Sequence, residues 1–226
     1  MDRGAVLSKT PLFKGCPIED LAELSAALKP RTYPKRTFVF REGDPGNAFF
    51  IVSSGQVKIG RLGPGGEEVV FAVLNPGDSF GELALLEDDP VRVADAQAVE
   101  ASECLTLGRD AFNSFLDRHP STTRRLIQVL IGYIRATDAS LAETAFLDIP
   151  GRVATKLLEL AESHGEKVAG GTRIDLKLSQ RTLAGMVAAS RENVNRALSR
   201  FQSQGVISQE GGYITIRHPD RLARRA

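Results

Sequence analysis

The chain has 226 residues, of which 42% are hydrophobic and 25% are charged, and its formal net charge at pH 7 is +1. This composition is typical of a soluble globular protein with one large or two modest domains. The sequence contains no apolar run long enough to span a membrane and no basic-then-apolar signal segment at its N-terminus. We therefore expect a cytoplasmic protein that has no membrane partner.

Charge is distributed unevenly along the chain. Residues 150–226 carry 13 Lys and Arg against 7 Asp and Glu, whereas the preceding residues carry 16 against 21. A basic C-terminal third predicts a polyanionic partner at one end of the protein, although a solvated basic surface is an alternative. Cys16 and Cys104 lie far apart without CxxC spacing, so we expect reduced, buried thiols and no metal site.

Short alternating apolar runs dominate the first half of the chain. They follow an amphipathic helix that is predicted over residues 18–28 by apolar residues at helical spacing. Glycine and proline turns separate the runs, a pattern that is typical of an antiparallel β-barrel or jelly roll. The predicted strands include residues 37–40, 49–52, 56–59 and 69–74, with a return to strand at 91–96 and 103–107.

A long helix without internal proline is predicted over residues 121–148, after a shorter helix over residues 110–116. Pro150 is expected to end the long helix, and Gly151 permits a change of direction. Apolar residues alternate by four and three positions along it, which resembles a coiled-coil seam and predicts packing against the barrel or against a second copy in a homodimer. The seam positions are Leu126, Leu130, Tyr133, Thr137, Leu141, Thr144 or Ala145, and Asp148.

The basic third of the chain predicts a winged helix-turn-helix. It begins with an amphipathic helix over residues 152–163 and a strand over 172–178, after which Ser179 and Ser190 each stand where they can cap a short helix. The second capped helix, up to residue 201, would lie in the DNA major groove, and the runs at 206–208 and 213–216 would form the wing. For this Arg-rich helix taken alone, a solvated surface is the alternative.

Two opposite charges stand out between the barrel strands. Arg92 lies between Val91 and Val93, and a charge in apolar surroundings needs a partner. Its planar guanidinium suits a phosphate, while the carboxylate of Glu82 can accept hydrogen bonds from ribose hydroxyls. A short helix that begins near Gly81 would direct backbone N–H groups toward the same anion. Alternatively, Glu82 and Arg92 pair with each other and bind nothing.

The sequence around Glu82 and Arg92 resembles a known ligand-binding motif. Segment 77–85, Gly-Asp-Ser-Phe-Gly-Glu-Leu-Ala-Leu, followed by Arg92, closely resembles the phosphate-binding cassette of cyclic-nucleotide-binding domains, in particular that of the CRP/FNR family of bacterial regulators. The resemblance implies that Glu82 binds the ribose 2′-hydroxyl and Arg92 the cyclic phosphate of cyclic AMP. Val93 replaces a common Ser or Thr, which leaves its backbone N–H for the phosphate. The implied cassette residues are Gly81, Glu82, Leu83, Arg92 and Val93.

The resemblance extends to both later helices. In the family a Thr at the position of Thr137 contacts adenine, and its neighbour reaches across from the other subunit. That neighbour is commonly Ser and is Asp138 in this chain. Alternatively, the hydroxyl of Thr137 bonds only to the backbone of its own helix. Segment 190–196, Ser-Arg-Glu-Asn-Val-Asn-Arg, resembles the recognition helix, whose two Arg and Glu contact the bases of a TGTGA-type half-site. The implied DNA-binding residues are Ser179, Gln180, Ser190, Arg191, Glu192, Asn193, Asn195 and Arg196.

Together these patterns predict an α+β protein. Residues 1–120 would form a cyclic-nucleotide-binding β-barrel or jelly roll, 121–149 a dimerisation helix and hinge, and 150–226 a winged helix-turn-helix. The expected function is a homodimeric regulator that binds palindromic double-stranded DNA under allosteric control of cyclic AMP, with RNA polymerase as a further partner. A family member that senses another effector, or none, is the alternative. An enzyme is not expected, because no nucleophile–base or metal spacing appears.

Overall fold

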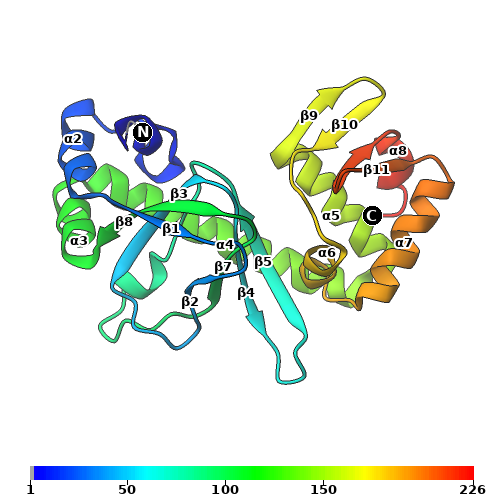
Figure 1. Cartoon of the computed structure of the whole chain (residues 1–226), viewed down its shortest axis with the longest axis horizontal. Helices are drawn as coiled ribbons and strands as arrows, with labels where there is room; N and C mark the ends of the chain where they lie inside the picture. The colour runs from blue at the N-terminus through cyan, green and yellow to red at the C-terminus, as the bar shows by residue number, and fades with distance from the viewer. Residues whose placement is uncertain (1–2) are drawn as a thin grey trace. The chain divides into compact units, whose positions relative to one another are not determined.

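The computed structural model describes residues 3–226, which form two compact units (Figure 1). Unit 1 contains the residues up to Leu62 together with Phe71–Ile134, and unit 2 contains Gly63–Val70 together with Arg135–Ala226. The β-barrel lies mainly in unit 1, whereas unit 2 carries most of the later helices and a separate small sheet. The α+β fold class is confirmed, and the three-part domain division stays a prediction.

The described chain opens with α1 (Arg3–Lys9), the 3₁₀ helix η1 (Pro11–Phe13) and α2 (Ile18–Ala27). The last of these confirms the helix predicted over residues 18–28, with acidic residues in its first turn and leucines on its buried face. The first two have no predicted counterpart, because they are too short to show an apolar period. The later helices are α3 (Arg109–Arg118), α4 (Pro120–Phe146), α5 (Ile149–His164), α6 (Gln180–Met186), α7 (Arg191–Ser203) and α8 (Pro219–Ala223).

Two four-stranded sheets form the barrel, with strand orders β1-β8-β3-β6 and β2-β7-β4-β5. Neighbouring strands such as β3 and β8, or β4 and β7, are antiparallel. Because most neighbours are not consecutive in the chain, the barrel is a jelly roll rather than a simple meander. Its strands are β1 (Lys29–Tyr33), β2 (Phe38–Phe40), β3 (Ala48–Ser54), β4 (Val57–Leu62), β5 (Glu68–Leu74), β6 (Ser79–Phe80), β7 (Asp95–Ala98) and β8 (Ser102–Gly108).

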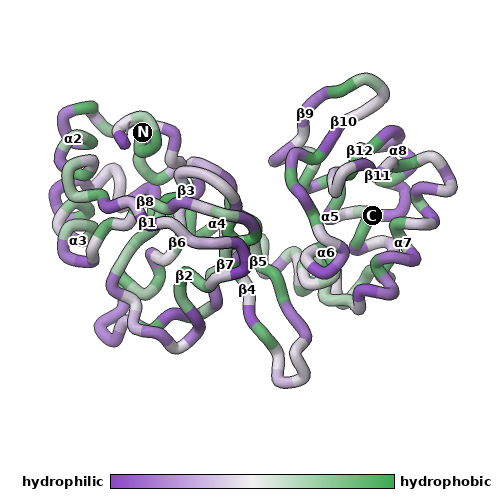
Figure 2. The backbone as a smooth tube through the Cα atoms, viewed as in Figure 1, coloured by the Kyte–Doolittle hydropathy of each residue, from purple (hydrophilic) through white to green (hydrophobic). Residues whose placement is uncertain are grey.

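Aromatic rings fill the space on both faces of β3. Phe49 stacks on Phe112 with ring centroids 4.7 Å apart and meets the edge of Phe13 at 6.0 Å. The next residue, Phe50, points to the opposite face and stacks on Phe80 at 5.0 Å. Hydropathy alternates over short steps along both units (Figure 2), as expected for elements that bury one face. The second of these clusters places aromatic rings beside the predicted cassette.

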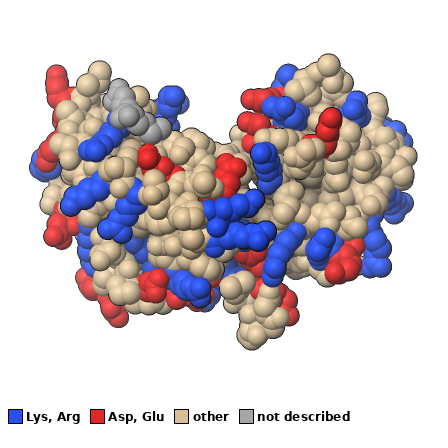
Figure 3. All heavy atoms as spheres, in the orientation of Figure 1, with Lys and Arg blue, Asp and Glu red and all other residues tan. Residues whose placement is uncertain are grey.

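Charged side chains of both signs are interspersed on the visible face of each unit (Figure 3). Of the helices that residues 3–226 form, none combines the length and the apolar character needed to cross a membrane. Within the same residues no group of three or more His, Cys, Asp or Glu side chains could hold a metal ion. Both cysteines are free, as predicted, but Cys16 is only partly buried, contrary to the prediction. Burial of Cys104 raises the pKa of its thiol to about 12. This thiol is therefore protonated and unreactive at neutral pH.

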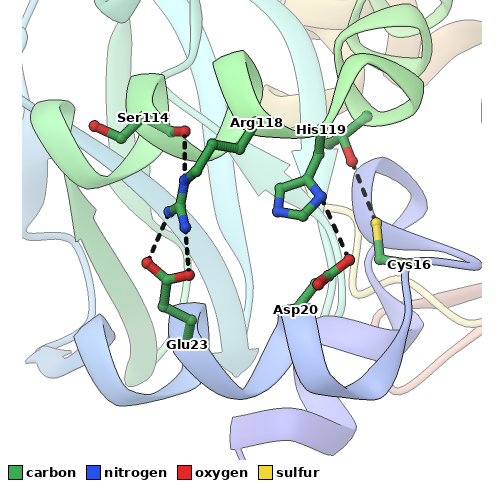
Figure 4. A network of polar contacts seen from close by, with 7 residues as sticks. Cys16, Asp20, Glu23, Ser114, Arg118 and His119 are labelled. Atoms are coloured by element: carbon green, nitrogen blue, oxygen red, sulfur yellow. Dashed lines mark hydrogen bonds and ion pairs between the residues drawn. The ribbon is translucent and has the colours of Figure 1, made fainter.

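Polar contacts fasten α2 to the junction between α3 and α4 (Figure 4). Arg118 donates two hydrogen bonds of 2.7 Å to the carboxylate of Glu23, and these lower the pKa of Glu23. His119 Nδ1 lies 3.3 Å from Asp20 Oδ2. The Cys16 thiol adds a contact of 3.3 Å to a threonine hydroxyl in the first turn of α4. These contacts therefore join α2 and the residues just before it to the start of the long helix within unit 1.

The long helix ends two residues earlier than predicted. Asp148 Oδ1 accepts a hydrogen bond of 2.8 Å from the backbone N–H of Gly151, so Asp148 is the N-cap of α5 and not a seam residue. Pro150 stands in the first turn of α5, where an N–H is not needed. The prediction that Pro150 ends the long helix is therefore wrong, because an Asp followed closely by Pro begins a helix.

Unit 2 contains the predicted winged helix-turn-helix, built on a sheet of order β11-β12-β10-β9. The wing turn has positive φ at Gly211 and Gly212, 59° and 87°, as its two-residue hairpin requires. The strand predicted over residues 172–178 ends at Ile174, because the apolar alternation beyond it reflects burial and not strand pairing. Strand β9, which comes first of the four in the chain, has no predicted counterpart. The strands are β9 (Gly165–Val168), β10 (Gly171–Ile174), β11 (Ile207–Glu210) and β12 (Tyr213–Ile216).

Candidate functional site

The cassette residues lie on the segment that connects β6 to β7. Gly81 has φ +89°, and a Cβ there would lie 2.8 Å from Arg92 Nη1 and 3.2 Å from the carbonyl oxygen of Ala48. Any larger residue would be strained in this left-handed conformation and would also occupy the space of the guanidinium. Glu82 comes next and immediately precedes the 3₁₀ helix η2 (Leu83–Leu85). Gly81 therefore permits the close approach of Arg92 to the backbone.

Arg92 lies in a loop and not in the strand predicted over residues 91–96, because β7 begins at Asp95. Its backbone N–H donates to the carbonyl of Asp44, and its own carbonyl accepts from the N–H of Gly43, each at 2.9 Å. The alternation that suggested a strand is real, but it places Arg92 inside and the valines on either side of it outside. The irregular pairing with the loop before β3 turns the charged side chain inward.

The guanidinium of Arg92 is buried and is held by backbone carbonyls. The residue is 4% exposed, and Nη1 donates to Gly81 at 2.7 Å while Nη2 donates to Ala48 at 2.6 Å. The guanidinium lies 4.2 Å from the ring centroid of Phe40, a favourable cation–π distance. Burial lowers the pKa of Arg92, and attraction to Glu82 opposes that shift. Arg92 Nε is buried and has no partner among the described residues.

The carboxylate of Glu82 is the second buried charge of the cassette. Glu82 is 4% exposed, and within residues 3–226 its Oε2 atom has no hydrogen-bond partner. Desolvation raises the pKa of Glu82, although a hydrogen bond from Tyr133 on α4 and attraction to Arg92 both act to lower it. Burial and the nearby carboxylate in turn raise the pKa of Tyr133. A buried carboxylate oxygen without a donor is costly, so this position suits an incoming hydroxyl group.

Pairing between Glu82 and Arg92 alone does not satisfy either group. Both terminal nitrogens of Arg92 donate to carbonyls, and one carboxylate oxygen of Glu82 has no donor. The two charges attract each other without completing each other's hydrogen bonds. Together they form a site that can accept a molecule with an anionic group and a neighbouring hydroxyl.

The rim of the cassette is apolar. Leu83 is 37% exposed and Val93 is 47% exposed, and the side chain of Val93 offers no hydroxyl to an anion. Thr137 and Asp138 are exposed and lie on the part of α4 that belongs to unit 2. Their implied contacts with a nucleotide stay predictions.

Three groups at the cassette are missing from the predicted site residues. The sequence predicts Tyr133 only as a seam residue, although its position four residues before Thr137 places both on one helix face. Phe40 lies under the guanidinium of Arg92. Strand alternation can indicate which way the Phe40 ring points, but not that Arg92 lies above it. The contact with the carbonyl of Ala48 has no signal in the sequence, because every residue has a backbone carbonyl.

Both predicted helix caps of the helix-turn-helix are confirmed. The Ser179 hydroxyl accepts a hydrogen bond of 3.0 Å from the N–H of Thr182, and the Ser190 hydroxyl accepts one of 3.3 Å from the N–H of Asn193. These bonds satisfy N–H groups that the first turns of α6 and α7 leave open. One face of α7 packs into the core of unit 2. Its residues Val194, Ala197, Leu198 and Phe201 are each at most 3% exposed.

The opposite face of α7 presents polar side chains to solvent. Arg191, Asn195 and Arg196 are exposed there. Glu192 accepts hydrogen bonds from its own backbone N–H and from the Ser190 hydroxyl, and these lower its pKa. Arg196 donates to the side-chain oxygen of Asn193. Such a face offers both donors and acceptors to base edges in a major groove.

The turn between α6 and α7 stores backbone strain. Ala188 has φ +47°, a left-handed conformation that costs a residue with a Cβ about 1–2 kcal/mol. Because the methyl group is exposed, we expect Ala188→Gly to raise the free energy of unfolding of unit 2 by about 0.5–1 kcal/mol after the entropy of glycine is subtracted. Denaturant unfolding measures the change. Ala189→Gly, at a position without positive φ, is the control and should destabilise; equal effects of the two variants would contradict the assignment of strain.

Two family models match the chain: a cyclic nucleotide-binding domain over residues 30–119 and a Crp-like helix-turn-helix domain over residues 151–225. The "CRP-like cAMP-activated global transcriptional regulator" of Mycobacterium tuberculosis is 38% identical over 221 residues, which are 98% of this chain and 98% of that protein. The chain belongs to the CRP/FNR family of transcriptional regulators. Members of this family are transcription factors and not enzymes.

Further similarities support the same placement in the CRP/FNR family. The cyclic AMP receptor protein of Thermus thermophilus is 33% identical over 208 residues, which are 92% of this chain and 93% of that protein. The structure of FixK2 from Bradyrhizobium japonicum is 26% identical, covers 88% of this chain and 96% of that chain, and gives a TM-score of 0.77. This CRP/FNR protein is therefore a DNA-binding transcriptional regulator with a cyclic nucleotide-binding domain.

Proposed function

We propose that this CRP/FNR regulator binds cyclic AMP between Glu82 and Arg92 and that, as a homodimer, it reads a palindromic operator under control of that nucleotide. The buried, unpartnered atoms Glu82 Oε2 and Arg92 Nε are the observation that carries the proposal. Cyclic AMP offers a ribose hydroxyl to the carboxylate and an anionic phosphate to the guanidinium. The backbone N–H of Val93 would add a further donor to the phosphate.

Exposed apolar residues along α4 support the homodimer. They lie on a helix of 27 residues whose buried positions are concentrated in its first two turns. A second copy of the helix would cover them, and in that dimer Thr137 and Asp138 would complete the nucleotide site. The exposed residues are Ile127 at 53%, Ile131 at 43%, Ile134 at 62% and Leu141 at 70%.

In the homodimer, two α7 helices would enter successive major grooves. Half-sites then lie about 34–36 Å apart, centre to centre, and the operator is palindromic because the dimer is symmetric. Cyclic AMP can change the affinity for such an operator only by binding one arrangement of the two helices more tightly than the other. RNA polymerase is the expected partner of the DNA-bound dimer.

A regulator that responds to another effector, or to none, is the second candidate. Two observations favour it: Val93 has no hydroxyl for a phosphate, and both terminal nitrogens of Arg92 are already bonded to carbonyls. Thermal unfolding of the full chain with cyclic AMP, cyclic GMP and cyclic di-GMP distinguishes the candidates. We expect cyclic AMP at 100 times its dissociation constant to stabilise the chain by about 2.7 kcal/mol. Stabilisation by another nucleotide alone, or by none, would favour the second candidate.

We expect Arg191→Ala to lose the preference for one base of the operator, at a cost of about 1–3 kcal/mol, because arginine binds guanine through two hydrogen bonds. Selection of operators from a random DNA library by the full chain measures the preference. Arg200→Ala is a matched control, since Arg200 is exposed on the same helix but lies outside the implied reading set. An operator profile that is the same for native and Arg191→Ala chains would count against the role of Arg191.

A further inference from the structure

Three polar side chains form a hydrogen-bonded relay between α6 and α7. Gln180, the first residue of α6, donates from Nε2 to Asn195 Oδ1 at 2.8 Å. Arg191, the first residue of α7, donates from Nε to Gln180 Oε1 at 3.4 Å. Gln180 is partly buried, whereas Arg191 and Asn195 are exposed on the polar face of α7. One amide on α6 thus contacts two candidate reading residues on α7.

The chemistry of arginine fixes the direction of every bond in this relay. A guanidinium can only donate, so the atom of Gln180 that faces Arg191 must be the carbonyl oxygen Oε1. The amide nitrogen of Gln180 then faces Asn195 and requires the oxygen of that side chain as its acceptor. Consequently Asn195 directs Nδ2 away from the relay, and Arg191 keeps its two terminal nitrogens for other partners.

We infer that Gln180 is a positioning residue that determines which edges Arg191 and Asn195 present to DNA. The inference rests on the proposed reading of DNA by α7. Arg191 then reads a base with its terminal nitrogens, as two bonds to guanine O6 and N7 require. Asn195 acts as a donor, which favours guanine or thymine, whose major-groove oxygens accept. With Oδ1 turned toward Gln180, Asn195 does not present its donor and its acceptor together to the edge of an adenine.

Gln180→Glu reverses one link of the relay and provides the test. The glutamate still accepts from Arg191, but it cannot donate to Asn195, so the Asn195 amide turns to donate to the glutamate and exposes its oxygen. Operator selection by the full chain, with and without cyclic AMP, measures the result. At the base where Asn195→Ala loses discrimination, we expect the preference to change about tenfold, from guanine or thymine toward adenine or cytosine, whose amino groups donate.

Two further variants keep the test decisive. Gln202→Glu introduces the same charge at an exposed position of α7 outside the relay and should leave the preference unchanged. If Gln180→Glu no longer binds DNA, Gln180→Ala replaces it, and we expect weaker discrimination at both the Arg191 and Asn195 positions with an unchanged melting temperature. Unchanged preferences in the Gln180 variants would overturn the positioning role alone. Failure of the native chain to select any motif would instead contradict the proposed function.

Discussion

Replacement of Arg92 by alanine should weaken the binding of cyclic AMP at least 100-fold and abolish the response of DNA binding to the nucleotide. Hydrogen bonds to a charged group contribute about 1.5–3 kcal/mol each, so the loss of a two-pronged contact with phosphate removes roughly 3–6 kcal/mol. Calorimetry of the full chain with cyclic AMP measures the affinity. Weak, nucleotide-independent DNA binding should remain, because α6 and α7 lie in unit 2 and Arg92 in unit 1.

Arg41→Ala is the matched control for this experiment. The Arg41 guanidinium also lies 4.2 Å from a phenylalanine ring centroid, that of Phe38, but the residue is exposed and has no place in the cassette. Loss of a cation–π contact at Arg41 should leave nucleotide affinity unchanged. Arg92→Lys should retain part of the affinity, because it keeps the charge but not the planar fork. Equal affinities of the native and Arg92→Ala chains for cyclic AMP would refute the assignment.

Glu82→Gln should have opposite effects on stability and on binding. At pH 7 we expect the variant to unfold with a free energy about 1–3 kcal/mol higher than the native chain, because a buried charge with an unpartnered oxygen is replaced by a neutral amide. Its affinity for cyclic AMP should fall at least tenfold, because the charged acceptor for the ribose hydroxyl is lost. Denaturant unfolding and calorimetry measure the two effects on the same protein.

The stability effect of Glu82→Gln should depend on pH in a definite direction. Because the pKa of Glu82 is raised in the folded protein from its ordinary 4.5, the folded state favours the protonated carboxyl. This shift contributes its full stabilisation of the folded state below pH 4.5, and the stabilisation is lost as the pH rises through the folded pKa of Glu82. The stability gap between variant and native chain should therefore be small at pH 4 and grow toward pH 7. Glu87→Gln, at an exposed position nearby, should show no such gap; a gap that narrows with rising pH would contradict the burial argument.

Local signals in the sequence predicted the helix-turn-helix correctly because its caps and apolar face are local chemistry. Ser179 and Ser190 cap helices through bonds that span three residues, and periodicity identifies the face that carries Phe201. The same kind of signal misled at the end of α4. The sequence pattern predicts that Pro150 ends the long helix, whereas the cap formed by Asp148 places Pro150 in the first turn of the next helix. A proline disrupts the helical turn that precedes it but is tolerated in the first turn of a helix. The position of the capping residue therefore decides whether a proline ends one helix or begins the next.

The cassette was predictable only in part, because its contacts join residues far apart in the chain. The chemistry of Glu82 and Arg92 indicated an anion and a hydroxyl ligand, and the structure brings both side chains into unit 1 as buried charges. The carbonyl of Ala48, 44 residues before Arg92, and the hydroxyl of Tyr133 could not be inferred from spacing. These contacts depend on how the strands of the barrel and α4 meet.

A crystal structure of the full chain grown with excess cyclic AMP tests the central claim most directly. We expect one nucleotide in each cassette, with its phosphate on the guanidinium of Arg92 and its ribose 2′-hydroxyl on the previously unpartnered oxygen of Glu82. A cassette that stays empty, or in which other side chains of the protein satisfy Glu82 and Arg92, would contradict the account of nucleotide sensing.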